Sequence, residues 1–307
     1  MIVDSDAHFT PKLEGEITKS IWYEQFLLRV NRFSNPDDRH KEMREKLFVD
    51  RQLLNPTARS LGLTYSLEDK IALQVMQAYN AAMCQMCDKY SYYDYNIWLA
   101  LQNPEQCIDE IKIHKDKCFA AYANDIVYWG FADNMKTVWQ TLEYYKMPLY
   151  LHFSGETYNP HEQIPEEFLQ FANSIDKSKK WLLSIASLLL SDMLTEFPNL
   201  KIIVAERNID WIPYLRELFL CHGFDDPLSL LKTNFWFTIE PESINFLENA
   251  QTIGYNKLLF ATDWPHNDPG ACNAQHDVAT VNKLNISVEQ KNMIFYKNYI
   301  DLQNKVN

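Results

Sequence analysis

Short apolar segments recur along the chain, and most of them are separated by stretches with helical periodicity. The segments are continuous apolar runs rather than alternating ones, which indicates strands buried on both faces of a parallel sheet. Eight strands are predicted, near residues 1–8, 51–56, 96–102, 117–124, 148–154, 200–207, 235–240 and 257–263. Long helices are predicted at 67–89 and 133–146, and further helices finish the chain.

Eight strand–helix units in 307 residues fit a (β/α)8 TIM barrel of the α/β class. A doubly wound open sheet is the alternative, but the chain has no Gly-x-Gly-x-x-Gly turn and only 7 glycines. We expect one domain over 1–307, with extra C-terminal helices. Residues 10–45 are charged and mostly helical in pattern, so we expect a helical insertion after strand one that covers the site as a lid.

Composition narrows the classes of partner. The net charge of −12 disfavours nucleic acid or an anionic membrane as a partner. No apolar run approaches the roughly 20 residues that span a bilayer, and the chain begins directly with a strand rather than a signal peptide. The six cysteines show no framework spacing and are interpreted as free thiols. We therefore expect a cytoplasmic protein that acts on a small molecule.

Polar side chains with metal-binding chemistry follow several of the predicted strands. Asp6 and His8 lie two residues apart and would share one face of strand one. His152 ends strand five, Glu206 ends strand six and Asp263 ends strand eight. Because the active site of such a barrel lies at the C-terminal ends of the strands, these side chains are expected to converge.

The mixed set of histidines and carboxylates suits Zn, Mn or Fe, and Mg less obviously. One alternative for Asp6 and His8 alone is an exposed aspartate beside a histidine at the core edge. Glu206 could be an acid or base, a fourth protein ligand, or a structural residue. Asn55, at the end of strand two, is a candidate substrate contact. Arg207 could grip a substrate carboxylate or form a local salt bridge.

Several motifs together are characteristic of one family. They are DSDAHF (4–9), YN (79–80), YLHFSG (150–155), FPNLKIIVAERNIDWIPYL (197–215) and LLFATDWPH (258–266). With them the chain resembles the amidohydrolase-related group of the metal-dependent amidohydrolase superfamily, the branch of aminocarboxymuconate-semialdehyde decarboxylase and the aromatic-acid decarboxylases.

The resemblance implies a barrel with one divalent metal ion and suggests a homodimer. Carried over by position, Asp6, His8 and His152 would be metal ligands, and Asp263 a ligand, a proton carrier, or both. His266 would be a catalytic residue that orients Asp263, or alternatively a partly buried histidine bonded to the backbone. No lysine ends strand four, where two-metal relatives hold a carboxylated lysine, so a mononuclear site is expected.

The chain also departs from the family. Glu206 stands where its decarboxylases carry a catalytic histidine, and Arg207 and Asn208 replace the usual small residues. We therefore expect first a hydrolase of a small carboxylated or cyclic substrate, which would use a metal-bound water with Asp263 as proton acceptor. The alternatives are a nonoxidative decarboxylase of a small aromatic or unsaturated acid, and an inactive ligand-binding barrel.

Overall fold

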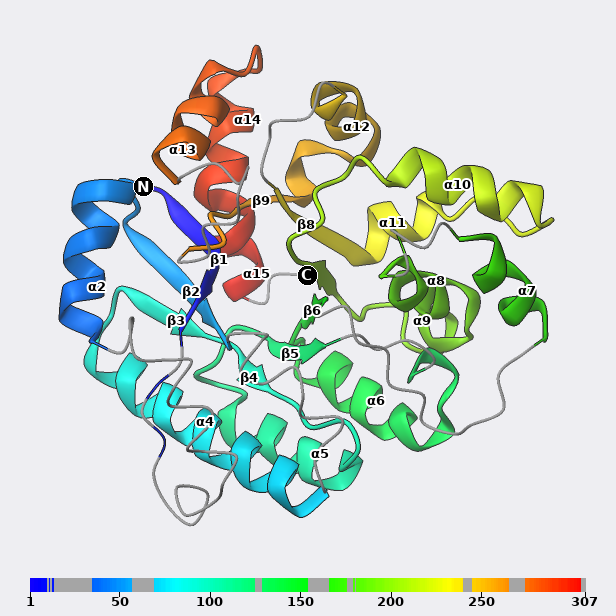
Figure 1. Ribbon diagram of the computed structural model, residues 1–307, viewed down its shortest axis with the longest axis horizontal. Coiled ribbons are helices and arrows are strands. Elements are labelled where there is room, and N and C mark those ends of the chain that lie inside the picture. Colours follow the sequence, from blue (N-terminus) through cyan, green and yellow to red (C-terminus); the bar gives the residue numbers. More distant parts are fainter. Residues whose placement is uncertain are drawn as a thin grey trace.

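The computed structural model describes residues 1–9, 11, 13, 35–56, 69–124, 129–153, 166–175, 179, 181–239, 245–264 and 274–304. Its strands lie at the centre of the molecule and its helices lie around them (Figure 1). The described strands are β1 (Val3–His8), β2 (Arg51–Asn55), β3 (Tyr93–Tyr95), β4 (Ile97–Trp98), β5 (Ala121–Asn124), β6 (Leu149–His152), β7 (Ile202–Val204), β8 (Phe235–Ile239) and β9 (Leu258–Phe260). Every pairing between them is parallel.

The strands form two hydrogen-bonded runs, β1 to β3 and β4 to β9, which join at both ends. At one junction, Asn96 links β3 to β4: its amide donates to the carbonyl of Leu54 at 3.2 Å, and the next amide, of Ile97, donates to Ala120 at 3.0 Å. One strand thus serves both runs. At the other junction, the Asp263 amide donates to Asp6 at 3.0 Å, and the His8 amide donates to the carbonyl of Trp264 at 2.7 Å. The predicted eight-stranded TIM barrel is confirmed.

The helices follow the strands in the expected order, and the bounds are as follows. They are α2 (Pro36–Glu42), α4 (Asp69–Lys89), α5 (Pro104–His114), α6 (Lys136–Tyr144), α7 (Glu166–Ser174), α8 (Leu182–Leu190), α9 (Met193–Glu196), α10 (Ile212–Cys221), α11 (Leu228–Asn234), α12 (Phe246–Ile253), α13 (Ala274–Lys283), α14 (Val288–Asn292) and α15 (Asn298–Gln303). Short 3-10 helices are η4 (Trp129–Phe131), η5 (Asp133–Met135) and η7 (Tyr255–Lys257), and π-helical turns are η2 (Met43–Leu47) and η8 (Met293–Lys297). No helix within the described ranges is both long and apolar enough to cross a bilayer.

Only part of the predicted insertion, 10–45, belongs to the described residues. Its helix α2 begins at Pro36, because proline fits the first turn and the Asn35 side chain accepts from the Asp37 amide at 3.0 Å. The proposed lid role of the whole insertion stays a prediction.

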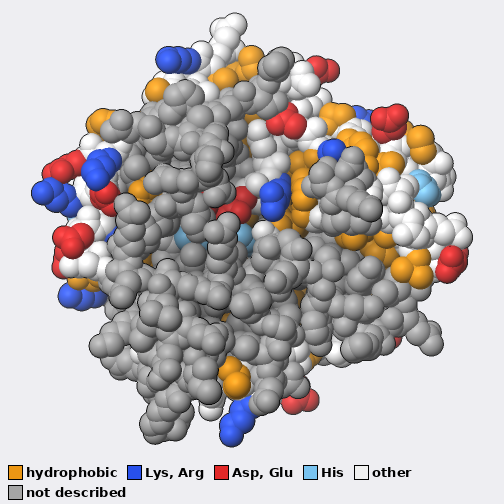
Figure 2. All heavy atoms as spheres, in the orientation of Figure 1, with side chains coloured by type: hydrophobic (Ala, Val, Ile, Leu, Met, Phe, Trp, Pro, Cys, Tyr) orange, Lys and Arg blue, Asp and Glu red, His pale blue; other side chains and the backbone are white. Residues whose placement is uncertain are grey.

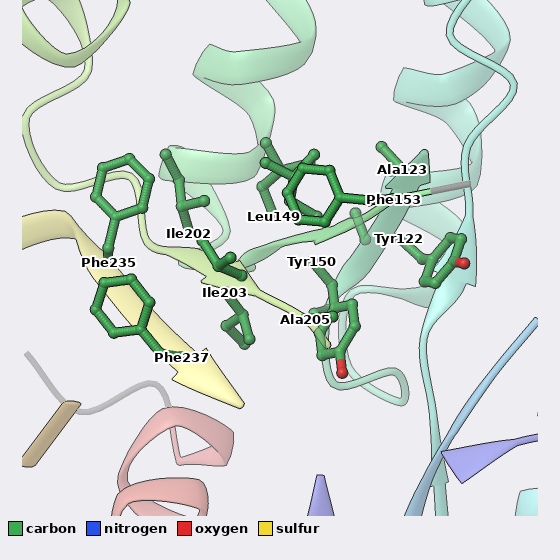
Figure 3. Packing of buried hydrophobic residues seen from close by; sticks show 14 of the residues in the cluster. Tyr122, Ala123, Leu149, Tyr150, Phe153, Ile202, Ile203, Ala205, Phe235 and Phe237 are labelled. Atoms are coloured by element: carbon green, nitrogen blue, oxygen red, sulfur yellow. The ribbon is translucent and has the colours of Figure 1, made fainter. Parts of the chain in front are cut away.

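The buried strands explain why their sequences are apolar throughout. Figure 3 shows side chains from β5, β6, β7 and β8 packed together, with Tyr122 and Tyr150 side by side. The rings of these two tyrosines stack at 6.0 Å between centroids, and both are fully buried. Tyr150 Oη donates to the carbonyl of Ser5 at 2.9 Å, which satisfies its hydroxyl and ties β6 to β1 across the barrel.

Strand β1 contains an irregularity that separates two sets of polar side chains. Asp4 pairs with Gln52 and Ala7 pairs with Leu54, so three steps along β1 match two along β2. Such a bulge re-aims the side chains on either side of it. Asp4 consequently contacts Gln52 and Thr262, whereas Asp6 and His8 face the opposite group of residues described below.

The third barrel strand differs from its prediction. The sequence predicts it at 96–102. Tyr93–Tyr95 instead form β3, and the strand ends at Trp98. The reason is that buried tyrosines pack well in a strand, so the polar-looking stretch is part of the barrel wall.

Candidate active site

Four side chains from distant parts of the chain meet at the C-terminal end of the barrel. His8 ends β1 and His152 ends β6, while Glu206 and Asp263 lie just beyond β7 and β9. His8 Nε2 lies 2.7 Å from Glu206 Oε1 and 3.0 Å from Asp263 Oδ1. His152 Nε2 lies 2.7 Å from the same oxygen of Glu206. Figure 2 shows described histidine, acidic and basic side chains gathered near the centre of this face.

The orientation of His8 is set by the backbone of the next strand. Its Nδ1 lies 2.9 Å from the carbonyl oxygen of Pro56, which can only accept a hydrogen bond. Nδ1 therefore carries the proton, and Nε2 faces the carboxylates of Glu206 and Asp263. This backbone contact fixes the tautomer in which the Nε2 lone pair can bind a metal ion.

The donor atoms of this cluster fit a divalent cation. One ligand atom each from His8, His152 and Glu206 lie within 4.8 Å of one another. Asp6 lies behind them, with Oδ1 3.8 Å from His8 Nε2. Within the described part of the chain, Oδ2 of Asp6 and Nδ1 of His152 are buried and lack hydrogen-bond partners, although burial of such atoms is costly without one. A metal ion would satisfy these donors together.

The ionisation of the cluster follows from burial and mutual charge. Burial raises the pKa of Asp6 well above its ordinary value, and the charge of Glu206 adds to the shift. Burial would also raise the pKa of Glu206, but His152 and His8 outweigh it and hold that pKa well below the ordinary value. Burial opposes the charged form of His8, yet its bonds to Asp263 and Glu206 raise its pKa well above normal. The negative charges of Glu206 and Asp263 stabilise a proton on His8, and they would stabilise a bound metal ion in the same way. Protonation of His8 and metal binding therefore compete.

A mixed histidine–carboxylate cluster at the mouth of a parallel barrel is typical of a metal-dependent enzyme. Comparison with known proteins identifies the family. The profile of the amidohydrolase family matches residues 3–299. The chain belongs to the amidohydrolase family. It is accordingly an enzyme of the metal-dependent amidohydrolase superfamily, as its motifs predict. No curated protein matches it by sequence.

Solved structures resemble this amidohydrolase over nearly its whole length. A 2,6-dihydroxybenzoate decarboxylase from Rhizobium is 17% identical, covers 99% of this chain and 98% of its own, and superposes with a TM-score of 0.73. A dihydroxybenzoic acid decarboxylase from Polaromonas sp. JS666, with bound manganese and 2-nitroresorcinol, is 17% identical, with coverages of 99% and 96% and a TM-score of 0.74. A 4-oxalomesaconate hydratase from Rhodopseudomonas palustris is 14% identical, with coverages of 100% and 96% and a TM-score of 0.67. At these identities the likeness shows the shared fold.

Asn55 lies behind the cluster of this amidohydrolase rather than at its surface. It is fully buried, and its Nδ2 donates to Asp6 Oδ1 at 2.7 Å. Its own Oδ1 accepts from Asn96 Nδ2 at 2.6 Å. These bonds hold the Asp6 carboxylate in place from the strand junction, so the geometry gives Asn55 a supporting position. The substrate contact expected of it stays a prediction.

Glu206 and Asp263 both have left-handed backbones, with φ of 55° and 51°. Residues other than glycine seldom adopt this conformation, and it costs free energy that surrounding contacts must offset. The Glu206 amide donates to Thr238 Oγ1 at 2.9 Å, and the Asp263 amide donates to β1. These bonds hold the two turns that aim both carboxylates at His8. Thr238 was not predicted as part of the site, because one threonine inside an apolar strand gives no distinctive signal.

Arg207, the residue after Glu206, lies over two aromatic rings that contact each other edge to face at 5.3 Å between centroids, those of Phe153 and Trp181. Its guanidinium carbon lies 5.5 Å from the ring centroid of Phe153 and 5.3 Å from that of Trp181. Its Nη2 reaches the carbonyl of Phe153 only at 3.4 Å, and its Nε is buried without a partner. No salt bridge joins Arg207 to a carboxylate within the described part of the chain. The arginine is therefore held by stacking, with donor capacity left for a ligand.

Arg39, on α2, was missed by sequence reasoning. It is 2% exposed, lies 4.3 Å over the Trp264 ring, and donates from Nη1 to the carbonyl of His8 at 2.8 Å. Its Nε donates to Gln52 Oε1 at 3.0 Å, and Gln52 Nε2 in turn donates to Asp4 at 2.9 Å. This chain of bonds supports β1 from the side opposite the cluster.

His266, predicted as catalytic, lies outside the described residues.

Proposed function

We propose that this amidohydrolase is a nonoxidative decarboxylase of a small aromatic or unsaturated carboxylic acid. The observation that carries the proposal is the position of Arg207, whose guanidinium lies over the adjoining rings of Phe153 and Trp181. Phe153 directly follows His152, and Arg207 directly follows Glu206, so apolar ring faces and a guanidinium adjoin the metal-type donors. A flat acid would find apolar walls and a cation in one place. The decarboxylases among the structural neighbours support the same choice.

His8, His152 and Glu206 would hold one divalent ion, with Asp6 completing the set. Manganese is bound in one structural neighbour, and zinc also suits these ligands. When bound, the ion supplies a Lewis acid that withdraws electron density from an oxygen-bearing substrate.

The protein's own groups have separate tasks in the proposed reaction. Arg207 binds an anionic oxygen of the substrate, and the two rings exclude water from its flat face. As the bond between the ring carbon and the carboxylate breaks, its electron pair stays on the ring carbon and carbon dioxide leaves. Asp263, whose Oδ1 lies 3.0 Å from His8 Nε2, delivers the proton that this carbon takes up.

Hydrolysis is the second candidate, and Glu206 is the observation that favours it. A carboxylate with a strongly lowered pKa, between two histidines, suits a base that takes a proton from water. The family's decarboxylases carry a histidine at this position.

The test is turnover of 2,6-dihydroxybenzoate and 5-carboxyvanillate, used as probes, by protein loaded with Mn or Zn in deuterated water. We expect release of carbon dioxide with one deuterium incorporated at the carbon that lost it. Turnover of ester, lactone or amide probes without carbon dioxide would replace this proposal with hydrolysis. Failure to bind stoichiometric metal would instead favour the ligand-binding barrel.

A further inference from the structure

A cavity of about 860 Å³ lies at the end of the barrel opposite the cluster. Its walls come from segments that lead into β6, β7, β8 and β9, together with α15. Three lysines line it: Lys146 precedes β6, Lys201 precedes β7 and Lys257 precedes β9. The cluster residues follow the same strands at their other ends, so the two sites are separated by the length of the barrel.

Two of these lysines, Lys201 and Lys257, lie over the indole ring of Trp236. Lys257 Nζ lies 3.5 Å from the ring centroid of Trp236, and Lys201 Nζ lies 5.8 Å from it. Lys257 is 8% exposed and donates to the carbonyl of Thr233 at 3.1 Å. An ammonium has three N–H donors, and the carbonyl and the indole face engage two of them. No carboxylate of the described residues forms a salt bridge with Lys257.

Lys201 disfavours the charge of Lys257, and Lys146 disfavours the charge of Lys201. Burial and the neighbouring Lys201 lower the pKa of Lys257 to about 8. Burial and Lys146 also lower the pKa of Lys201, against an opposing effect of Asp301. Glu143 is the other acidic residue of the lining, and its Oε1 accepts from the Asn199 amide at 2.7 Å. Three cations thus meet two carboxylates in a chain whose net charge is −12.

Two buried asparagines hold the lysine-bearing segments in place. Asn234 Nδ2 donates to two carbonyls of the segment that leads into Lys201, those of Pro198 at 2.9 Å and Leu200 at 3.0 Å. Asn298 Nδ2 does the same around Lys257, reaching Tyr255 at 2.7 Å and Leu258 at 2.8 Å. The backbone under both cations is therefore fixed in advance, which lowers the entropy that a bound ligand must offset.

We propose that this cavity is a binding site for a small multivalent oxyanion, remote from the reaction centre. The anion would lie against Lys201 and Lys257 and would offset the positive charge that these two lysines bring to the cavity. Inorganic phosphate and a small dicarboxylate share the required chemistry: compact size, more than one negative charge and several oxygen acceptors. The site would sense the concentration of such an anion without contacting the substrate.

The probe is inorganic phosphate, titrated calorimetrically into the full-length protein at about pH 7 with ionic strength held constant by chloride. We expect saturable binding that weakens about tenfold or more in Lys257→Met and in Lys201→Gln. Lys257→Arg, which keeps the charge, should retain binding and controls for folding. The matched surface control is Lys112→Gln, an exposed lysine on α5, which should bind as the parent does.

Phosphate could also bind the histidine–carboxylate cluster, so the titration is repeated on His152→Ala. Binding retained in that variant and lost in the lysine variants supports the proposal, and a succinate titration then tests dicarboxylates. Binding lost in His152→Ala, unaffected by the lysine changes, or equalled by chloride would overturn it. None of these outcomes depends on turnover, so the result is independent of the proposed decarboxylation.

Discussion

Arg39 Nη1 donates to the backbone carbonyl of His8 at 2.8 Å. This bond joins a helix of the insertion to the strand that carries one of the candidate metal ligands. It is made by a buried guanidinium that also stacks on Trp264, so the contact is rigid as well as charged.

Arg39→Met should therefore lower both the free energy of unfolding and the affinity for metal. Loss of a buried charged hydrogen bond costs about 1.5–3 kcal/mol. Urea unfolding with and without added zinc measures both effects. Arg39→Lys should recover little of either, because an ammonium cannot reach Gln52 and His8 while stacking flat on an indole. Full recovery by lysine would show that charge alone matters.

Metal content should depend on His152. We expect about one divalent ion per chain in protein purified without chelator, and its loss in His152→Ala, because that change removes a ligand from a mononuclear site. Mass spectrometry of metals per chain measures it. His222→Ala, a change at an exposed histidine on another helix end, is the matched control and should keep its metal. Equal metal in both variants would contradict the assigned ligand set.

Glu206→Gln should reduce metal content and lower turnover by about a hundredfold or more, since it keeps the side chain's size while removing its charge. Left without the carboxylate, His8 loses one of the contacts that raise its pKa. Metal analysis and single-turnover kinetics separate binding from chemistry. A variant with full metal and full activity would reduce Glu206 to a structural residue.

Arg207→Met should raise the KM for an acidic substrate far more than it lowers kcat, because the arginine is assigned to binding. The loss of a charged hydrogen bond, about 1.5–3 kcal/mol, corresponds to roughly a tenfold to hundredfold change. Arg207→Lys should lie between the two, as it keeps charge but loses the stacked plane. An unchanged KM in both would place the substrate carboxylate elsewhere.

Lys257 should make stability depend on alkaline pH. Its pKa is lowered from 10.5 to about 8 in the folded protein, so the unfolded chain binds more protons between these two values. The free energy of unfolding contributed by this group should consequently rise as pH increases through that window, and be lost as pH falls through about 8. Lys257→Met should unfold at higher urea than the parent near neutral pH and lose the advantage above about pH 10. A constant difference at all pH values would exclude this origin.

The sequence alone predicts the barrel because each strand is buried on both faces and therefore apolar throughout. It also predicts that His8 and His152 converge, since both end parallel strands whose C-terminal ends share one rim. The structure brings Glu206 and Asp263 to the same place, as the strand order requires.

Other features leave no local signal. The left-handed backbone conformations of Glu206 and Asp263 could not be predicted, because glycine is the residue that usually adopts this conformation. Strand three was misplaced because the polar Asn96 interrupts a run that the preceding tyrosines begin. Arg39 could not be predicted, since its partners Gln52, His8 and Trp264 lie on three separate segments that only the fold brings together.

The closure of the barrel by β1 and the residues after β9 determines when the site can form. His8 and Asp263 lie far apart along the chain, so the ribosome makes the first long before the second, and each donates a backbone hydrogen bond to the other's strand region. A growing chain that ends before Asp263 therefore lacks both the last barrel seam and one of the carboxylates. The nascent protein cannot assemble the complete site early, and its first strand must wait, unpaired on one edge, for the last.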